Sequence, residues 1–109
     1  MARFENKQGI ERITMKPKVI CFCPLGSAFY TNQFEITVKP GKVIPDYCEV
    51  DSWVKENIAG KTLTIEDSVN NVLQYLVDEY KPLQVFISSK VEDAAHFPVE
   101  VEKEYFKEN

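Results

Sequence analysis

Two cysteines one residue apart, Cys21 and Cys23, end the apolar run KVICFC, and Pro24 follows directly. A cysteine thiolate can act as a nucleophile that forms covalent intermediates, and it can also bind zinc. Structural zinc sites usually separate paired cysteines by about two to four residues. Here the gap is one residue, the third cysteine, Cys48, is distant, and His96 is the sole histidine. We therefore predict no metal site.

The two neighbouring cysteines are expected to play different parts. On a strand both side chains would point to one face, and that spacing does not suit disulfide geometry. We predict that Cys21 fills the core and that Cys48 packs on a helix. Cys23 is either a small buried hydrophobe at a strand end or a nucleophile.

The elements that would position these residues follow from hydrophobic periodicity. Alternation predicts strands over residues 10–24, with a bend at Pro17, and over 32–40, 83–91 and 97–106. Helical spacing predicts helices over 45–60 and 64–82. Asp46 is the expected N-cap of the first helix, Thr64 and Asp67 form a capping box for the second, and Pro82 ends it.

This order predicts an α+β fold in a single domain spanning residues 1–109: a four-stranded antiparallel sheet with both helices on one face, in the order ββααββ. A sheet of this kind has open edges, which invite pairing with neighbouring chains. We therefore expect a cyclic homo-oligomer in which the sheets close into a ring or barrel.

The charge of the chain and its lack of targeting signals indicate which partners and which cellular location to expect. The net charge of −4 argues against a dedicated non-specific nucleic-acid binder, which needs clustered Lys and Arg. Lys16, Lys18, Lys39 and Lys42 either gather into a local basic patch or are solvated lysines at strand ends. The N-terminal residues lack the apolar core of a signal peptide, and no run is long enough to span a membrane. We predict a cytoplasmic protein with no membrane partner.

The segment FCPLGSAFYTNQFEI, residues 22–36, carries a resemblance to a known family. It resembles the Cys-Pro segment of the tunnelling-fold (T-fold) family of NADPH-dependent 7-cyano-7-deazaguanine (preQ0) reductases and their short QueF-like relatives, the archaeosine-forming amidinotransferases. The resemblance spans roughly residues 10–105. It implies that Cys23 is the catalytic cysteine. Asn32 falls where the family has a catalytic Asp, and Glu35 or His96 are the candidates to replace that proton-handling group.

The segment KTLTIEDSVNNVL, residues 61–73, resembles the family's His-Glu segment. The resemblance implies that Glu66 holds the deazaguanine ring, and Ile65 stands where the family usually has His. A carboxylate can accept two parallel N–H bonds from such a ring, but a Glu in the first turn of a helix is also stabilised by the helix dipole. Phe29 and Tyr30 either stack on a planar base or cap the core.

The resemblance favours an amidine-forming reaction over reduction. The lysine-bearing stretch linked to NADPH in the reductases is absent from VIPDYCEVDSW, residues 43–53. The implied reaction therefore uses no cofactor: Cys23 attacks the nitrile to form a thioimide, and ammonia displaces it, with the base carried in tRNA and the sites at subunit interfaces. The alternatives are an NADPH-dependent nitrile reductase of queuosine biosynthesis, or a non-catalytic protein that binds a purine- or pterin-like ligand.

Overall fold

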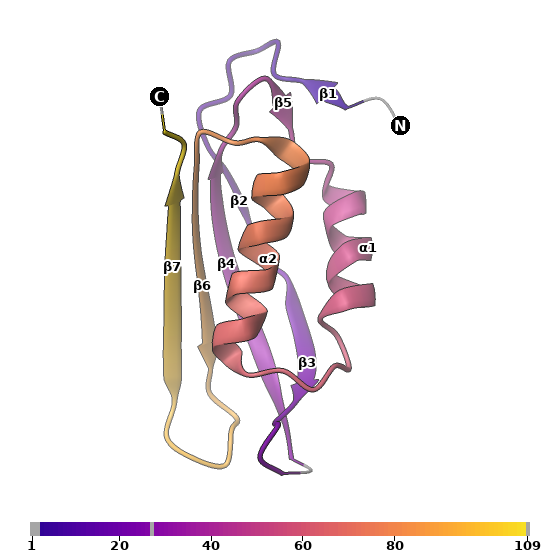
Figure 1. Cartoon of the computed structure of the whole chain (residues 1–109), viewed down its shortest axis with the longest axis vertical. Coiled ribbons are helices and arrows are strands. Elements are labelled where there is room, and N and C mark those ends of the chain that lie inside the picture. The colour runs from indigo at the N-terminus through magenta and orange to yellow at the C-terminus, as the bar shows by residue number, and fades with distance from the viewer. Residues whose placement is uncertain (1–2, 27, 109) are drawn as a thin grey trace.

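The computed structural model describes residues 3–26 and 28–108 (Figure 1). Its strands and helices follow one another as β1 (Phe4–Glu5), β2 (Ile13–Met15), β3 (Lys18–Phe22), β4 (Phe29–Lys39), β5 (Val43–Ile44), α1 (Tyr47–Asn57), α2 (Ile65–Tyr80), β6 (Gln84–Val91) and β7 (Val99–Phe106). The predicted α+β order is confirmed, with the short strands β1 and β5 added to it.

The main sheet is antiparallel and is organised around the long strand β4, which pairs with β2, β3 and β6, while β6 pairs with β7. The predicted first strand is divided into β2 and β3 at Pro17, which has no N–H to donate. The Pro17 carbonyl still accepts a bond of 2.9 Å from the Phe34 N–H, so both pieces stay beside β4. The sheet therefore consists of five strands. Because β2 and β3 lie one after the other along the same edge of β4, they occupy the place of the single first strand that the sequence predicted.

Both helices cover the same face of this sheet (Figure 1). Alternate residues of β4 and β6 are buried beneath them, as period-two patterning requires. The two helices also contact each other, because the rings of Trp53 and Tyr75 stack with centroids 4.3 Å apart. The opposite face of the sheet is left uncovered within the chain and carries the exposed side chains of Ile20, Phe22 and Phe29.

Both predicted N-caps form, but among the described residues only one of the two bonds of the predicted capping box is present, the one that Thr64 accepts. The Asp46 carboxylate accepts bonds from the Cys48 and Glu49 N–H groups, and the Thr64 hydroxyl accepts one of 3.0 Å from the Asp67 N–H. The prediction that Cys48 packs is wrong: its side chain is exposed, because α1 turns Val50 and Val54 toward the core instead. No helix of the described ranges is long and apolar enough to cross a membrane.

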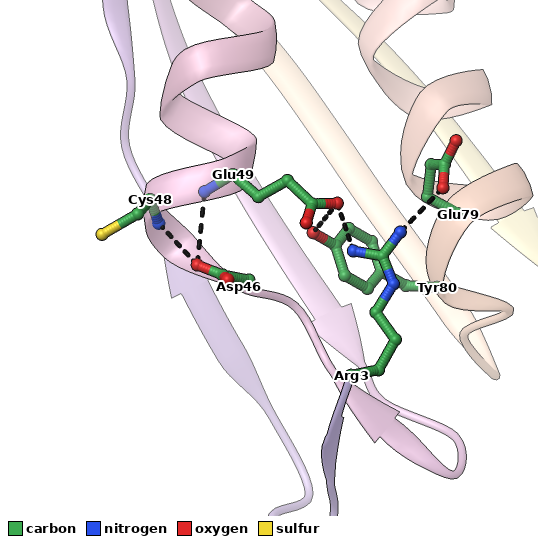
Figure 2. Close-up of polar contacts among 6 residues, drawn as sticks. All are labelled: Arg3, Asp46, Cys48, Glu49, Glu79 and Tyr80. Atoms are coloured by element: carbon green, nitrogen blue, oxygen red, sulfur yellow. Dashed lines mark hydrogen bonds and ion pairs between the residues drawn. The ribbon is translucent and has the colours of Figure 1, made fainter. Parts of the chain in front are cut away.

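An N-terminal clamp ties residues far apart in the sequence (Figure 2). The Arg3 guanidinium donates to Glu49 of α1 and to Glu79 of α2, and it lies over the Tyr80 ring, 4.5 Å from the centroid. The Tyr80 hydroxyl also donates to Glu49, at 3.0 Å. The bond from Arg3 is the main cause that holds the pKa of Glu49 below its ordinary value of 4.5.

Replacing Arg3 by alanine is therefore expected to destabilise the protein in a pH-dependent way. Because folding lowers the Glu49 pKa, this contribution is fully present above pH 4.5 and is lost as the pH falls through the folded-state pKa. The difference in unfolding free energy between Arg3→Ala and the parent should be largest at neutral pH and shrink below pH 4.5. Urea unfolding across this range measures it. A difference that is constant with pH would contradict the assignment, and Lys55→Ala, which breaks an exposed pair with Asp51, is the control.

Candidate active site

Cys23 lies directly after β3, where the chain leaves the sheet and turns back toward β4. The Cys23 N–H donates to the Ala28 carbonyl at 2.9 Å, and the Gly26 N–H donates to the Cys23 carbonyl at 3.3 Å. These bonds fix the backbone on both sides of the thiol. The side chain is partly exposed, as a nucleophile must be.

The connection between α1 and α2 brings the start of α2 beside Cys23. It runs parallel to the end of β3: the Phe22 N–H donates to the Lys61 carbonyl at 2.9 Å, and the Leu63 N–H donates to the Phe22 carbonyl at 3.1 Å. The Tyr30 hydroxyl donates to the Leu63 carbonyl from β4. Backbone pairing of β3 and the anchor from β4 therefore hold the N-terminus of α2 next to the cysteine.

Between these segments lies a cleft of about 210 Å³. Its lining is formed by the loop after β3, the start of β4, the start of α2 and the loop between β6 and β7, and it consists of Cys23, Pro24, Leu25, Ala28, Phe29, Tyr30, Leu63, Thr64, Ile65, Glu66, Ala94, Ala95 and His96. Four of the five site residues predicted from the sequence, Cys23, Phe29, Ile65 and Glu66, therefore border one cavity. His96, one of the two candidates for proton transfer, borders it as well.

The cleft combines apolar walls with polar side chains, among them Cys23, Glu66 and His96. The N-terminus of α2 faces it with Glu66 in the first turn, and the positive end of a helix dipole favours negative charge nearby. Phe29 is exposed and Tyr30 is buried, and both border the cavity. Burial also raises the pKa of the Tyr30 hydroxyl, which stays protonated as a donor.

Asp93 anchors the loop that carries His96, and no local pattern in the sequence indicates this role. Its carboxylate accepts bonds from the Thr31 N–H at 2.8 Å and from the Thr31 hydroxyl at 2.7 Å. These bonds hold the pKa of Asp93 below its ordinary value, so the carboxylate is ionised at neutral pH. The loop between β6 and β7 is thereby fixed to β4 at the rim of the cleft.

Asn32, the fifth predicted site residue, lies in the core and does not border the cleft. Its amide nitrogen donates to Cys21 Sγ at 3.1 Å and to Ser68 Oγ at 3.3 Å, and its amide oxygen accepts from Ser89 Oγ at 2.7 Å. The alternation with buried Phe34 and Ile36 was the signal that could have predicted this burial.

The other two residues considered from the sequence, Cys21 and Glu35, do not border the cleft. Cys21 is fully buried, as predicted, and burial raises the pKa of its thiol, which keeps it protonated at neutral pH. Glu35 lies on the uncovered face of β4, in a different hollow with Lys16, Lys18 and Lys90. No cluster of three or more potential metal ligands occurs among residues 3–26 and 28–108.

Two comparisons with known proteins give no match: no protein-family model and no curated protein sequence corresponds to this chain. Solved structures do match it. The archaeosine synthase QueF-Like is 17% identical with a TM-score of 0.80, covering 87% of this chain and 93% of its own. A structure assigned to a dihydroneopterin aldolase (FolB) from Vibrio cholerae O1 biovar El Tor str. N16961 is 15% identical with a TM-score of 0.75, covering 90% of this chain and 98% of its own. These likenesses establish the fold, and the predicted tunnelling fold is confirmed.

Proposed function

We propose that this protein is a QueF-like enzyme of 7-deazaguanine tRNA modification that converts the nitrile of 7-cyano-7-deazaguanine into an amidine. The observation that carries the proposal is that Cys23 and Glu66, supplied by separate segments, border one cleft. The proposal assigns Cys23 as the nucleophile and Glu66 as the carboxylate that binds the guanine-like ring. The structural likeness to an archaeosine synthase supports it. The likeness to a FolB structure supports an enzyme or a purine- or pterin-binding protein more generally.

The reaction needs a nucleophile, ammonia and proton transfer. The Cys23 thiolate attacks the nitrile carbon, forming a C–S bond while one electron pair moves to the nitrile nitrogen, which takes a proton to give a thioimide. Ammonia adds to the same carbon, the C–S bond breaks, and the sulfur leaves as thiolate. The sum is nitrile plus ammonia giving amidine, with no change in oxidation state, so the proposed reaction uses no NADPH or other redox cofactor.

His96 is the proton carrier that this proposal assigns. It borders the same cleft as Cys23, whereas Glu35 lies on the other face of β4 and Asn32 lies in the core. An imidazole can both give and take a proton in a reaction. The bond of 2.7 Å between His96 Nδ1 and the Phe97 carbonyl requires a proton on Nδ1, which leaves Nε2 as the group that would exchange one.

Glu66→Gln is expected to weaken binding of 7-cyano-7-deazaguanine by about tenfold to a hundredfold. The amide keeps the size of the side chain but loses the negative charge and one of two acceptors for parallel N–H bonds. Isothermal titration with the Cys23→Ala background isolates binding from reaction. The matched control is Asp67→Asn, an exposed carboxylate one residue along that does not border the cleft. Equal affinities for Glu66→Gln and the parent would contradict the role of Glu66.

The function is tested by incubating the protein with ammonium and 7-cyano-7-deazaguanine, once as the free base and once carried in tRNA, and detecting the amidine by mass spectrometry. Parallel incubations contain NADPH. The proposal expects amidine with the tRNA-carried base. Formation of an amine with consumption of NADPH would overturn it in favour of a nitrile reductase. Tight binding of the base without any product would overturn it in favour of a non-catalytic ligand-binding protein.

The proposal includes assembly into a cyclic homo-oligomer, with each cleft completed at a subunit interface. The uncovered sheet face carries exposed Ile20 and Phe22 on β3 beside exposed Phe29 on β4, and of these Phe29 also borders the cleft. Large apolar side chains gathered on one face commonly mark an interface. Light scattering after size-exclusion chromatography is expected to give a mass several times 12.6 kDa, and a monomer at micromolar concentration would contradict the assembly.

A further inference from the structure

A basic groove lies at the end of the molecule opposite the Cys23 cleft. It is formed around β1, β5 and the C-terminal end of α2, at the top of Figure 1, whereas the loop after β3 is at the bottom. The groove has a volume of about 1120 Å³, and the chain is 46 Å long in this direction. The two hollows therefore cannot share one small ligand.

The groove gathers positive charge in a chain that is acidic overall. Of 13 Lys and Arg residues in the chain, six border the groove, and only two of the 17 Asp and Glu residues do. The six cations are Arg3, Arg12, Lys39, Lys42, Lys81 and Lys107. The net charge of −4 does not reveal that the positive side chains are concentrated in one groove. The folded protein therefore has a basic surface although the chain as a whole is acidic.

One of the six cations, Arg3, already forms ion pairs within the protein. Arg3 is held by Glu49 and Glu79 in the N-terminal clamp (Figure 2), so it builds the wall of the groove. Within residues 3–26 and 28–108, the other five, Arg12, Lys39, Lys42, Lys81 and Lys107, take part in no ion pair. Their charges are available to an anion from solution.

Close packing of two turns brings three of these lysines together. Gly41, in the turn between β4 and β5, lies so near the turn after α2 that an added Cβ would be 2.9 Å from the Lys81 carbonyl oxygen. Lys81 itself has a φ of 46°, a conformation that non-glycine residues rarely adopt. Lys39 and Lys42 thus border the groove from one turn and Lys81 borders it from the other.

We infer that this groove binds the phosphodiester backbone of a nucleic-acid strand. The five cations without ion-pair partners come from several segments, an arrangement that suits the successive phosphates of a strand better than a single small anion. The volume of the groove also exceeds that of most small-molecule pockets, about 300–1000 Å³. Tyr80 is the aromatic residue on the lining, and Arg3 covers its ring, so it offers no stacking surface to a base. Binding should therefore depend on phosphate and not on base sequence.

The inference goes beyond the reaction at Cys23 and does not depend on it. The test is fluorescence anisotropy with a labelled single-stranded RNA of mixed sequence at increasing salt. The variant is Arg12→Gln/Lys42→Gln/Lys107→Gln, which removes three exposed charges from the groove. The matched control is Lys16→Gln/Lys18→Gln/Lys61→Gln, which makes the same change in net charge at exposed lysines outside it.

Five phosphate contacts to a single strand predict a slope of about −3.5 for the logarithm of the association constant against that of salt concentration. Affinity should fall about a hundredfold between about 50 and 200 mM salt. In the groove variant the slope should drop to about −1.4, whereas the control should keep the parent slope. Adduct formation at Cys23 with the free base should be unchanged in both variants, so failure of this inference is distinguishable from failure of the proposed function.

Three results would overturn the inference. The first is no RNA binding by the parent at the lowest salt, and the second is an equal slope in the groove variant and the control. The third is displacement of the RNA by ATP or inorganic phosphate at micromolar concentration and constant ionic strength, which would identify the groove as a site for a small phosphate compound instead of a strand.

Discussion

Replacing Cys23 by alanine should lower amidine formation by at least about a thousandfold while leaving the fold intact. The alanine side chain cannot form the C–S bond on which the proposed reaction depends, and the partly exposed position makes no side-chain hydrogen bond in the described structure that would be lost. Product formation by mass spectrometry under single-turnover conditions measures the effect, and circular dichroism checks the fold.

Cys48→Ala is the matched control for this loss, because Cys48 is the other solvent-exposed thiol and lies on α1 away from the cleft lining. Its activity should equal that of the parent. Residual activity of Cys23→Ala within tenfold of the parent would assign the chemistry to another group. Cys21→Ala is unsuitable as a control, because Cys21 is buried and bonded to Asn32 and the Ile58 carbonyl.

Asn32→Ala should destabilise the protein by about 3 kcal/mol without removing any group from the cleft. Asn32 is fully buried, and its three side-chain bonds connect β4 with β3, α2 and β6 through Cys21, Ser68 and Ser89. Alanine leaves a cavity and two serine hydroxyls with fewer partners, and each buried polar group left unsatisfied costs free energy. Urea unfolding measures the change.

The neighbouring Gln33→Ala is the control, because its side chain reaches only Glu92 on the surface, at 3.3 Å; it should change stability by less than about 0.5 kcal/mol. Asn32→Asp separates a core role from a catalytic one. An ionised Asp has no hydrogen to donate to Cys21 or Ser68, so this variant should also be destabilised and should gain no activity. An Asn32→Asp variant that is equally stable and more active than the parent would show that position 32 takes part in the reaction.

Local patterns in the sequence predicted the main elements of the fold, and the resemblance to a known family predicted four residues of the cleft. Alternation along residues 32–40 and the caps at Asp46 and Thr64 act within a few residues, so the central strand and the starts of both helices followed from them. The residues of the cleft were found through a resemblance at Cys23 and Glu66, and β3 and α2 bring these two to one cavity.

What the sequence did not predict depends on contacts between distant segments. The bond between Thr31 and Asp93 joins residues that are 62 positions apart in the sequence, and the bond between Arg3 and Glu79 joins residues that are 76 positions apart. The basic groove likewise collects lysines from separate turns, which no single window of sequence contains. The burial of Asn32 did not depend on such contacts, because it follows from the alternation of buried residues along β4. The resemblance instead indicated a catalytic position for Asn32.

The central claim is that Cys23 attacks the nitrile carbon of a 7-cyano-7-deazaguanine base. The direct measurement is the intact mass of the protein after incubation with that base in the absence of ammonia, followed by peptide mapping. We expect each chain to gain the mass of one base, carried by the peptide that contains Cys23. Absence of any adduct between about pH 6 and 9, where a cysteine acquires thiolate character, or an adduct on Cys48 instead, would contradict the account.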